Sequence, residues 1–291
     1  TIMTGFLFSF YKKCIKKLSL GYGLSKFYPI RTAMKKIESN FKSDFAIVQG
    51  NKMFLDPGDS LDLSIRGVYG ELDTEIVKNE IKSGDIVIDV GANIGYYTLI
   101  FAKLVGKTGK VIAFEPESKN FELLKKNVTI NELTNVVLEQ KVVSDKNERT
   151  KLFLANSGIV GHHINPTKNN ENFIEVDSIT LDDYLRENNL THKINFLKID
   201  VEGAEIKVLN GAKTILQNHN LKIFTEFNRE VIKKLGMDPR QILSLLTSNG
   251  FKLFLPNYKF NNVSETNVDE LLSSKETILE NLNILCKKLS L

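Results

Sequence analysis

The chain has 291 residues, of which 42% are apolar and 25% charged, and these proportions are typical of a soluble globular protein with one large core. Its net charge of +4 is uneven, because residues 1–42 carry nine Lys or Arg and one acid, whereas residues 43–291 carry 30 basic and 34 acidic groups. A body with this acidic excess is a poor partner for nucleic acid. The two cysteines, Cys14 and Cys286, are expected to be ordinary reduced thiols. No Cys or His spacing matches a zinc site.

Residues 1–42 are predicted to form a basic amphipathic N-terminal extension, and residues 43–291 a single enzyme domain. The extension places aromatic residues and leucines beside paired lysines, and its apolar run is too short to span a bilayer. It also lacks a cleavage site with small residues, so secretion is not expected and the predicted location is cytoplasmic. We expect the extension to pack on the enzyme domain; peripheral contact with an anionic membrane is the alternative.

Residues 85–98 read D-I-V-I-D-V-G-A-N-I-G-Y-Y-T and are typical of a buried strand, a tight turn and the start of a helix. A hairpin at residues 45–55 and a helix at residues 72–82 are expected before this stretch. Gly91 and Gly95 allow a sharp turn and leave room for a ligand against the main chain. A cofactor is therefore expected at the carboxyl edge of a parallel sheet.

Two cofactors that contain adenosine commonly use such an edge. A nicotinamide dinucleotide prefers G-x-G-x-x-G, in which the second glycine lets the pyrophosphate approach the backbone, but this chain has Asn93 there. S-adenosylmethionine has no phosphate, and its methionine carboxylate and ammonium suit a helix amino end and a nearby acid. Asp89 and Asn93 can supply that polar surround, so S-adenosylmethionine is favoured.

Residues 110–115 predict the next strand, which ends in Glu115 and precedes a helix that Pro116 opens and that runs to about Ile130. A right-handed strand, helix, strand unit places the end of this strand beside the first glycine turn. The Glu115 carboxylate can there accept both ribose hydroxyls, which both cofactor classes require. This residue therefore indicates a ribose site without choosing the cofactor.

Residues 136–154 predict strands with a turn at 145–148, and residues 173–176 and 180–187 predict a further strand and a helix. Between them, His162 and His163 lie in a stretch that resembles a loop. Such a loop can fold over an acceptor, and an imidazole can act as a base near neutral pH. His163 is therefore a candidate catalytic residue, although most paired surface histidines have no such role.

Two more strands are predicted to end in acids, at Asp200 and at Glu226. Adjacent parallel strands would bring these carboxyl groups to one rim, where they could act as a general base, clamp a substrate or hold a divalent cation. Glu202 and Glu205 either join this rim or simply face solvent and cap the next helix. That helix is expected to run to about residue 218, followed by helical residues 231–248 and strands at 251–255 and 283–287, the last of them antiparallel.

In combination and order, four motifs resemble the FkbM family of S-adenosylmethionine-dependent methyltransferases: D-V-G-A-N-I-G-Y-Y-T, A-F-E-P, V-V-S-D and L-K-I-D-V-E-G-A-E. The resemblance implies that Asp89, Gly91, Asn93 and Gly95 hold the methionine part of the cofactor and Glu115 its ribose. It implies further that Ser144 and Asp145 bind the adenine edge. Glu71 is a weaker candidate, since Tyr69-Gly70-Glu71 replaces the family's Y-E-P. The family mainly methylates hydroxyl groups of sugars and polyketide-type natural products.

We therefore expect a doubly wound α/β domain with a mostly parallel sheet, which is the class I methyltransferase fold. The protein is expected to O-methylate a hydroxyl acceptor. The site residues expected to act on the acceptor are Asp200, Glu226 and His163. A nicotinamide-dependent oxidoreductase and a cofactor-binding protein without catalysis are the alternatives.

Overall fold

The computed structural model describes residues 45–154, 162–164, 172–258, 260–273 and 282–288. The N-terminal extension lies outside these residues, so its expected packing and its alternative contact with a membrane both stay predictions. Among the helices that can be described, none has the length and apolar character needed to cross a membrane.

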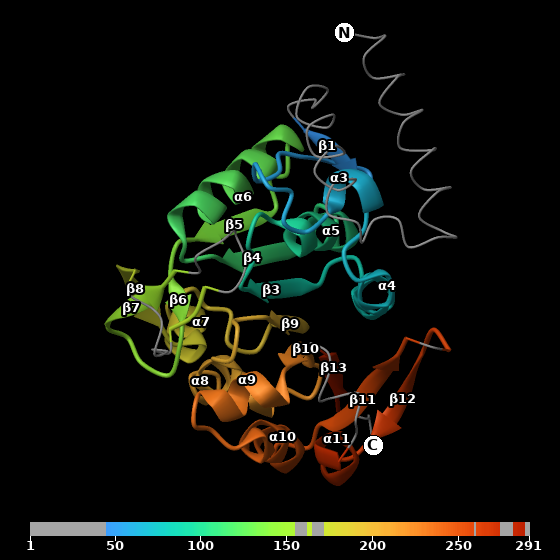
Figure 1. Ribbon diagram of the computed structural model, residues 1–291, viewed down its shortest axis with the longest axis vertical. Coiled ribbons are helices and arrows are strands. Elements are labelled where there is room, and N and C mark those ends of the chain that lie inside the picture. Colours follow the sequence, from blue (N-terminus) through green and yellow to red (C-terminus); the bar gives the residue numbers. More distant parts are fainter. Residues whose placement is uncertain (1–44, 155–161, 165–171, 259, 274–281, 289–291) are drawn as a thin grey trace, which may run out of the picture.

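An eight-stranded sheet lies at the centre of the molecule, in the order β12-β11-β13-β10-β9-β3-β4-β5 (Figure 1). Its parallel part consists of β5 (Val136–Glu139), β4 (Lys110–Phe114), β3 (Ile86–Val90), β9 (Phe196–Ile199) and β10 (Lys222–Phe227). The antiparallel β13 (Leu282–Lys287) separates β10 from β11 (Lys252–Asn257), and β12 (Asn262–Thr266) forms the edge. This arrangement confirms the predicted mostly parallel sheet and its antiparallel last strand.

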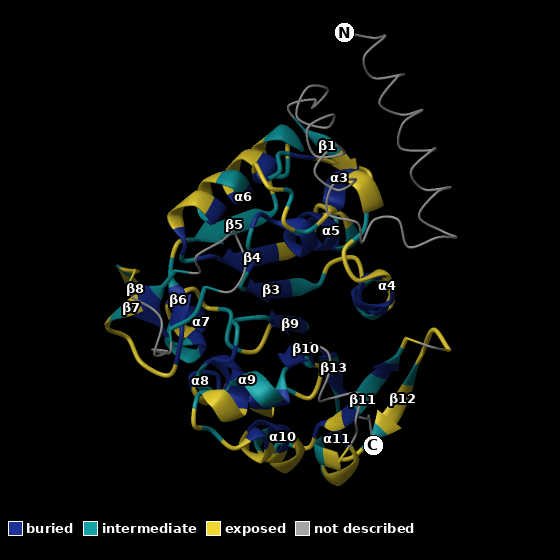
Figure 2. Ribbon diagram, viewed as in Figure 1, coloured by how far each residue is buried: buried dark blue, intermediate teal, exposed yellow. Residues whose placement is uncertain are grey.

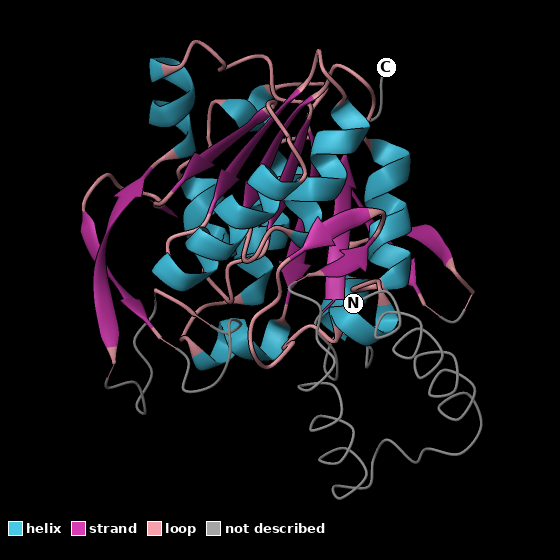
Figure 3. Ribbon diagram, turned by 90° about the horizontal axis from the view of Figure 1, so that it is seen from above, coloured by secondary structure: helices cyan, strands magenta, loops and turns pink. Residues whose placement is uncertain are grey.

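Helices cover both faces of this sheet, as Figure 3 shows from above. One face is covered by α3 (Leu63–Arg66), α4 (Glu71–Glu80), α5 (Tyr96–Val105) and α6 (Ser118–Ile130). The other is covered by α7 (Leu181–Glu187), α8 (Glu205–Asn210), α9 (Arg229–Lys234), α10 (Pro239–Ser248) and α11 (Val268–Ser273). The central strands are buried on both sides (Figure 2). The predicted doubly wound fold is therefore confirmed.

Successive side chains of the central strands enter two separate apolar cores, because side chains alternate along a strand. Ile88 and Val90 belong to the core under α7 to α10, whereas Val87 belongs to the core under α4 and α5. On β9, Leu197 and Phe196 divide in the same way. Asp89 lies two residues after Val87, and Lys198 lies two residues after Phe196. Both side chains therefore lie on the face covered by α4 and α5.

Two smaller sheets flank this body. The predicted first hairpin is confirmed as β1 (Ala46–Val48) and β2 (Asn51–Met53). Beyond β5, a three-stranded sheet is formed by β6 (Val142–Val143), β8 (Phe173–Ile179) and β7 (Arg149–Phe153).

Three details differ from the sequence-based expectations. The helix expected from Pro116 begins at Ser118, where the side chain of Glu117 accepts from the backbone N–H of Asn120. The helix after β9 ends at Asn210, and a separate 3₁₀ turn follows at Ile215–Gln217. The polar segment before β13 contains β12, which pairs with β11 and so needs few apolar anchors of its own.

Candidate active site

A cavity opens at the carboxyl edge of the parallel strands and encloses about 970 Å³ of empty space, including solvent at its mouth. Five of the ten site residues expected from the sequence line it: Gly91, Asn93, Glu115, His163 and Asp200. The other five, Asp89, Gly95, Ser144, Asp145 and Glu226, are not part of its described wall. The cavity thus joins three of the expected cofactor residues, Gly91, Asn93 and Glu115, to two of the expected acceptor residues, His163 and Asp200.

The turn between β3 and α5 has the left-handed backbone that the glycines predict, with φ of 80° at Gly91 and 97° at Gly95. Gly91 lines the cavity, so the expected approach of a ligand to its main chain stays a prediction, but protein atoms fill the space that a side chain at either glycine would occupy. A Cβ at Gly91 would lie 1.9 Å from the carbonyl oxygen of Asp200, and one at Gly95 would lie 2.7 Å from Leu124. The glycines therefore let β9 and α6 pack closely against the turn.

Glu115 is buried at the end of β4, and both of its carboxyl oxygens accept backbone hydrogen bonds. Oε2 accepts from Asn93 N at 2.8 Å, and Oε1 accepts from Glu117 N at 2.9 Å. Burial raises the pKa of Glu115 to about 7, against the opposing effect of these two N–H groups. Each oxygen keeps a lone pair for a further donor, so the carboxylate can still bind a diol.

Asn93 has a left-handed backbone with φ of 51°, a conformation that asparagine adopts more readily than most residues. Its side-chain Oδ1 accepts from the N–H of Ile94 at 2.7 Å, and its own N–H is held by Glu115. Asn93 thus shapes the loop that forms the cavity wall.

Asp89 is fully buried on β3, next to Lys198 on β9 in the register of the sheet. Its Oδ2 accepts from the hydroxyl of Thr98 at 2.6 Å, and its Oδ1 lies 3.5 Å from the ammonium of Lys198. Burial raises the pKa of Asp89, and the Lys198 ammonium opposes that rise. Asp89 lies behind the cavity wall and holds Lys198 there, so its expected direct contact with a cofactor stays a prediction.

Lys198 is a site residue that the sequence analysis missed. Its side chain is 4% exposed, lines the cavity and lies 3.3 Å from Oδ2 of Asp200, with the ammonium 5.0 Å from the ring centre of Tyr97. Burial alone would lower its pKa, but the carboxylates of Asp200 and Asp89 outweigh this effect and raise it. The signal in the sequence is a lysine inside the apolar run F-L-K-I, two residues from an acid.

Asp200 follows β9 at one end of the cavity, with a side chain that is 34% exposed. Glu226 is buried at the end of β10, and burial followed by Asp200, Glu205 and Glu202 raises its pKa to about 10. Glu226 is therefore protonated at neutral pH. The expected rim of acids is present, but only Asp200 of the expected pair lies in the cavity wall.

Glu205 binds backbone N–H groups just before α8, in agreement with the alternative that it caps this helix. Its Oε1 accepts from Val201 N at 3.2 Å and from Gly203 N at 3.1 Å. Burial raises the pKa of Glu205 to about 7. Glu205 thereby fixes the loop that carries Asp200 and Glu202, and Glu202 itself lines the cavity.

Tyr69 is a second residue that the sequence analysis did not place in the site. It lines the cavity beside Asp200, and burial followed by the charge of Asp200 raises its pKa to about 12. Glu71, the weaker candidate, begins α4 and is not part of the described cavity wall.

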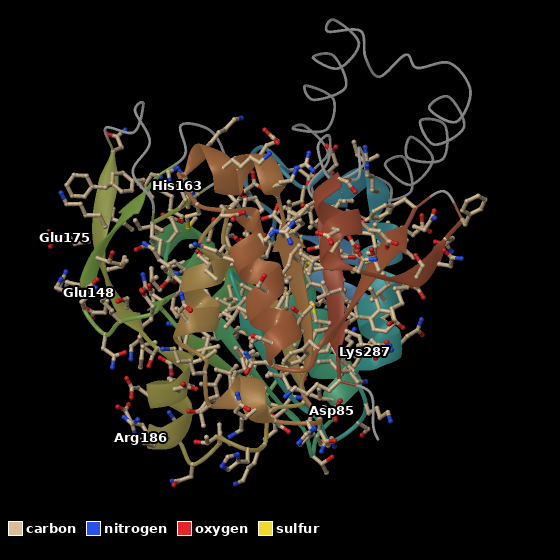
Figure 4. The ribbon with its side chains drawn as sticks, turned by 90° about the horizontal axis from the view of Figure 1, so that it is seen from below. Asp85, Glu148, His163, Glu175, Arg186 and Lys287 are labelled. Atoms are coloured by element: carbon tan, nitrogen blue, oxygen red, sulfur yellow. The ribbon has the colours of Figure 1, made fainter. Side chains whose placement is uncertain are left out.

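His162 and His163 line the opposite part of the cavity. His163 stacks on Phe153 with ring centres 6.0 Å apart, and its backbone exchanges hydrogen bonds with that of Phe153. Burial lowers the pKa of His162, and the nearest acid that acts on it is Glu117, beside Glu115. Figure 4 shows His163 at the end of the molecule opposite Asp85, which precedes β3. A catalytic role for His163 stays a prediction, and the surroundings of His162 associate this loop with the Glu115 end.

The expected adenine residues lie just beyond the cavity. Ser144 is buried, and its hydroxyl donates to Oδ1 of Asp145 at 3.1 Å. The preceding Val142 and Val143 line the cavity instead. Their apolar surface suits the face of a base, so contact of Ser144 and Asp145 with a ligand stays a prediction.

The family model described as "Methyltransferase FkbM domain" matches residues 89–253, from Asp89 on β3 to β11. The chain belongs to this family. The match runs through the turn after β3, Glu115, Asp200 and Glu226, and the chain is an S-adenosylmethionine-dependent methyltransferase. The nicotinamide-dependent alternative is therefore wrong.

Two curated proteins are similar to this FkbM-family chain. Hexuronic acid methyltransferase AglP of Haloferax volcanii is 29% identical over 63% of the chain and 70% of its own length. The 31-O-demethyl-FK506 methyltransferase FkbM of Streptomyces tacrolimicus is 28% identical over 59% of the chain and 74% of its own length.

Solved structures that resemble the chain include methyltransferase FkbM from Methylobacillus flagellatus, with 15% identity and a TM-score of 0.42. The likeness covers 70% of this chain and 44% of that one. Fibrillarin of Aeropyrum pernix, solved with natively bound S-adenosyl-L-methionine, is 13% identical, with a TM-score of 0.42 over 74% of each chain. At these TM-scores neither likeness contributes to the assignment.

Proposed function

We propose that this chain transfers the methyl group of S-adenosylmethionine to a hydroxyl group of a sugar ring, with Asp200 as the general base. The observation that carries the proposal is that one cavity contains both the Glu115 end, suited to a nucleoside, and the partly exposed carboxylate of Asp200. Polyketide-type hydroxyl compounds are the second acceptor class. Support for both comes from the relatives, one named for a hexuronic acid and one for an O-demethylated polyketide.

The residues of the cavity fit S-adenosylmethionine. Glu115 has acceptor capacity left for the two ribose hydroxyls, and Phe114, Val142, Val143 and Leu152 provide apolar walls for the base. The loop from Gly91 to Asn93 borders the region between them and Asp200.

When bound, S-adenosylmethionine supplies a methyl group that is activated by the positive sulfur. Asp200 would accept the proton of the acceptor hydroxyl and pass it to solvent, while the methyl group would move from the sulfur to the acceptor oxygen and leave S-adenosylhomocysteine. Lys198 holds Asp200 in place at 3.3 Å, and Tyr69 and Tyr97 shield this end of the cavity. The protein thus contributes mainly position, a proton acceptor and exclusion of water.

Asp200 is preferred to Glu226 as the base for two reasons. Asp200 lines the cavity, whereas Glu226 does not. Glu226 also holds its proton at neutral pH because of burial and the neighbouring acids. Across the part of the chain with described coordinates, no group of three or more His, Cys, Asp or Glu is placed to hold a metal ion, and no step of the proposed reaction is assigned to one.

The test is a transfer assay with radiolabelled S-adenosylmethionine and a panel of sugars and hydroxylated polyketides, with the product analysed for an O-methyl ether. Asp200→Asn is expected to lower kcat by about 10²- to 10⁴-fold, the usual contribution of a general base. Calorimetry with S-adenosylhomocysteine should show retained binding in this variant. Unchanged turnover in Asp200→Asn would remove the proposed base, and transfer to nitrogen or carbon would reject O-methylation.

A further inference from the structure

The charges at the Asp200 end of the cavity restrict the acceptor. We propose that the acceptor is neutral or carries an amine, and that the site selects against a carboxylate or phosphate near the reacting hydroxyl. The inference rests on the proposed function, because it concerns the acceptor end of the same cavity. Of the acceptor types considered above, uronic acids are the ones it disfavours.

Carboxyl groups gather at this end of the cavity from four elements. Asp200 and Glu202 line the wall. Glu205 and Glu226 lie nearby, since the charges of Asp200, Glu205 and Glu202 add to the effect of burial in raising the pKa of Glu226. Asp73 on α4 adds a fifth buried carboxyl group, held by Tyr258 Oη at 2.9 Å and by Asn283 Nδ2 at 3.0 Å. These elements are α4, the loop after β9, the start of α8 and the end of β10.

Cations at this end are few and already engaged. Lys198 is the lysine in the wall here, and its ammonium lies between Asp89 and Asp200, at 3.5 and 3.3 Å. Lys141 also lines the cavity, but it directly precedes β6, which lies on the opposite side of the molecule from α4 (Figure 1). The buried Arg229 after β10 donates to the carbonyl of Leu272 and pairs with Glu230. The described residues therefore offer no uncommitted cation to an anionic acceptor here.

The negative charges of this cluster act on the buried carboxyl group of Glu226. Burial raises the pKa of Glu226 to about 10, and the charges of Asp200, Glu205 and Glu202 add to this rise. The same potential acts on any charge that an acceptor brings in. The carboxylates of Asp89, Asp200 and Glu202 outnumber the two positive charges of Lys198 and a bound S-adenosylmethionine. A further anion therefore stays unfavourable, and an ammonium is attracted.

The experiment compares acceptors that differ only in charge. The methyl glycosides of glucose, galactose and mannose, their 2-amino-2-deoxy counterparts and the corresponding methyl uronosides are assayed with the full chain at pH 7.5 in low salt and in high salt. We expect kcat/KM for the uronosides to be at least about tenfold below that for the neutral glycosides, with a smaller gap in high salt. Equal or preferred use of uronosides would overturn the inference while leaving the proposed O-methylation intact. Failure of all nine compounds would count against the proposed sugar acceptor itself.

A pair of variants tests the cause of the selectivity. Glu202→Gln removes one carboxylate of the wall with little change of shape, and it should raise the ratio of uronoside to neutral kcat/KM several-fold. Glu122→Gln, an exposed position on α6, makes the same change in net charge away from the cavity and should leave the ratio unchanged. An unchanged ratio in Glu202→Gln, or an equal shift in both variants, would contradict the role given to the local charge.

Discussion

The ammonium of Lys198 lies 3.5 Å from Oδ1 of Asp89, and the two residues are register partners on adjacent parallel strands. Both side chains are almost fully buried. A charge in such a place is tolerated only with a partner, because the loss of hydration is otherwise uncompensated. The pair therefore joins the strand before the glycine turn to the strand that carries Asp200.

Replacing one member of this pair should lower the free energy of unfolding more than replacing both. Lys198→Met leaves the Asp89 carboxylate buried without its cation, and we expect the free energy of unfolding to fall by about 3–5 kcal/mol. The double variant Lys198→Met, Asp89→Asn should recover part of that loss. Urea denaturation of the single and double variants measures the coupling, and additive losses would show that the pair contributes no mutual stabilisation.

Close packing beside Gly91 predicts a second large effect. Gly91 has φ of 80°, and a Cβ there would lie 1.9 Å from the carbonyl oxygen of Asp200. Gly236 has nearly the same backbone, with φ of 77°, but no atom lies within 4 Å of the corresponding Cβ. Gly236→Ala should therefore lower the free energy of unfolding only by the penalty of a left-handed backbone for a residue with a Cβ, roughly 1–2 kcal/mol.

Gly91→Ala should cost several kcal/mol more than Gly236→Ala, because β9 must move away from the turn. The difference in melting temperature between the two variants isolates the steric part. Equal losses would mean that the contact between Gly91 and Asp200 is easily relaxed.

The raised pKa of Glu115 predicts how stability depends on pH. Burial raises this pKa to about 7 in the folded chain, against an ordinary value of 4.5. The folded state therefore binds the proton more tightly, and the free energy of unfolding should fall as pH rises from about 4.5 to about 7, by roughly 3 kcal/mol from this residue. Glu115→Gln should remove this part of the pH dependence while Glu205 keeps its own contribution.

The same titration should affect ligand binding. A ribose hydroxyl donates to the ionised carboxylate, so affinity for S-adenosylhomocysteine should increase as pH rises through 7. Calorimetry between pH 6 and 8 checks this expectation. A slope that persists in Glu115→Gln would assign the effect to another group.

Glu226 and Asp200 should respond differently to amide substitution. Because Glu226 has a pKa of about 10 and is protonated at neutral pH, Glu226→Gln replaces one neutral group by another of similar shape. Turnover at pH 7.5 should then stay within a few-fold of the wild type, in contrast to Asp200→Asn. A loss as large as that of Asp200→Asn would return Glu226 to the catalytic role expected from its position at the end of β10.

Local patterns predicted much of this molecule. The apolar runs that end at Asp89, Glu115 and Asp200 correctly indicated buried parallel strands whose carboxyl ends share one edge, because strand periodicity and right-handed crossovers leave few alternatives. The same patterns placed Glu115 in the cavity. They did not reveal β12, whose exposed edge position requires no apolar alternation.

Motifs and periodicity within short segments were enough to predict the family, the doubly wound fold and the edge at which the cavity lies. Which side chains reach the cavity, and in which charge state, depends on the tertiary structure. Gly91 has no side chain that would clash with the backbone of Asp200, and Asp89 is buried beside Lys198. Glu226 is protonated because of burial and of the acidic residues near it. Each of these properties depends on desolvation and on contacts between residues distant in sequence, which no local pattern encodes.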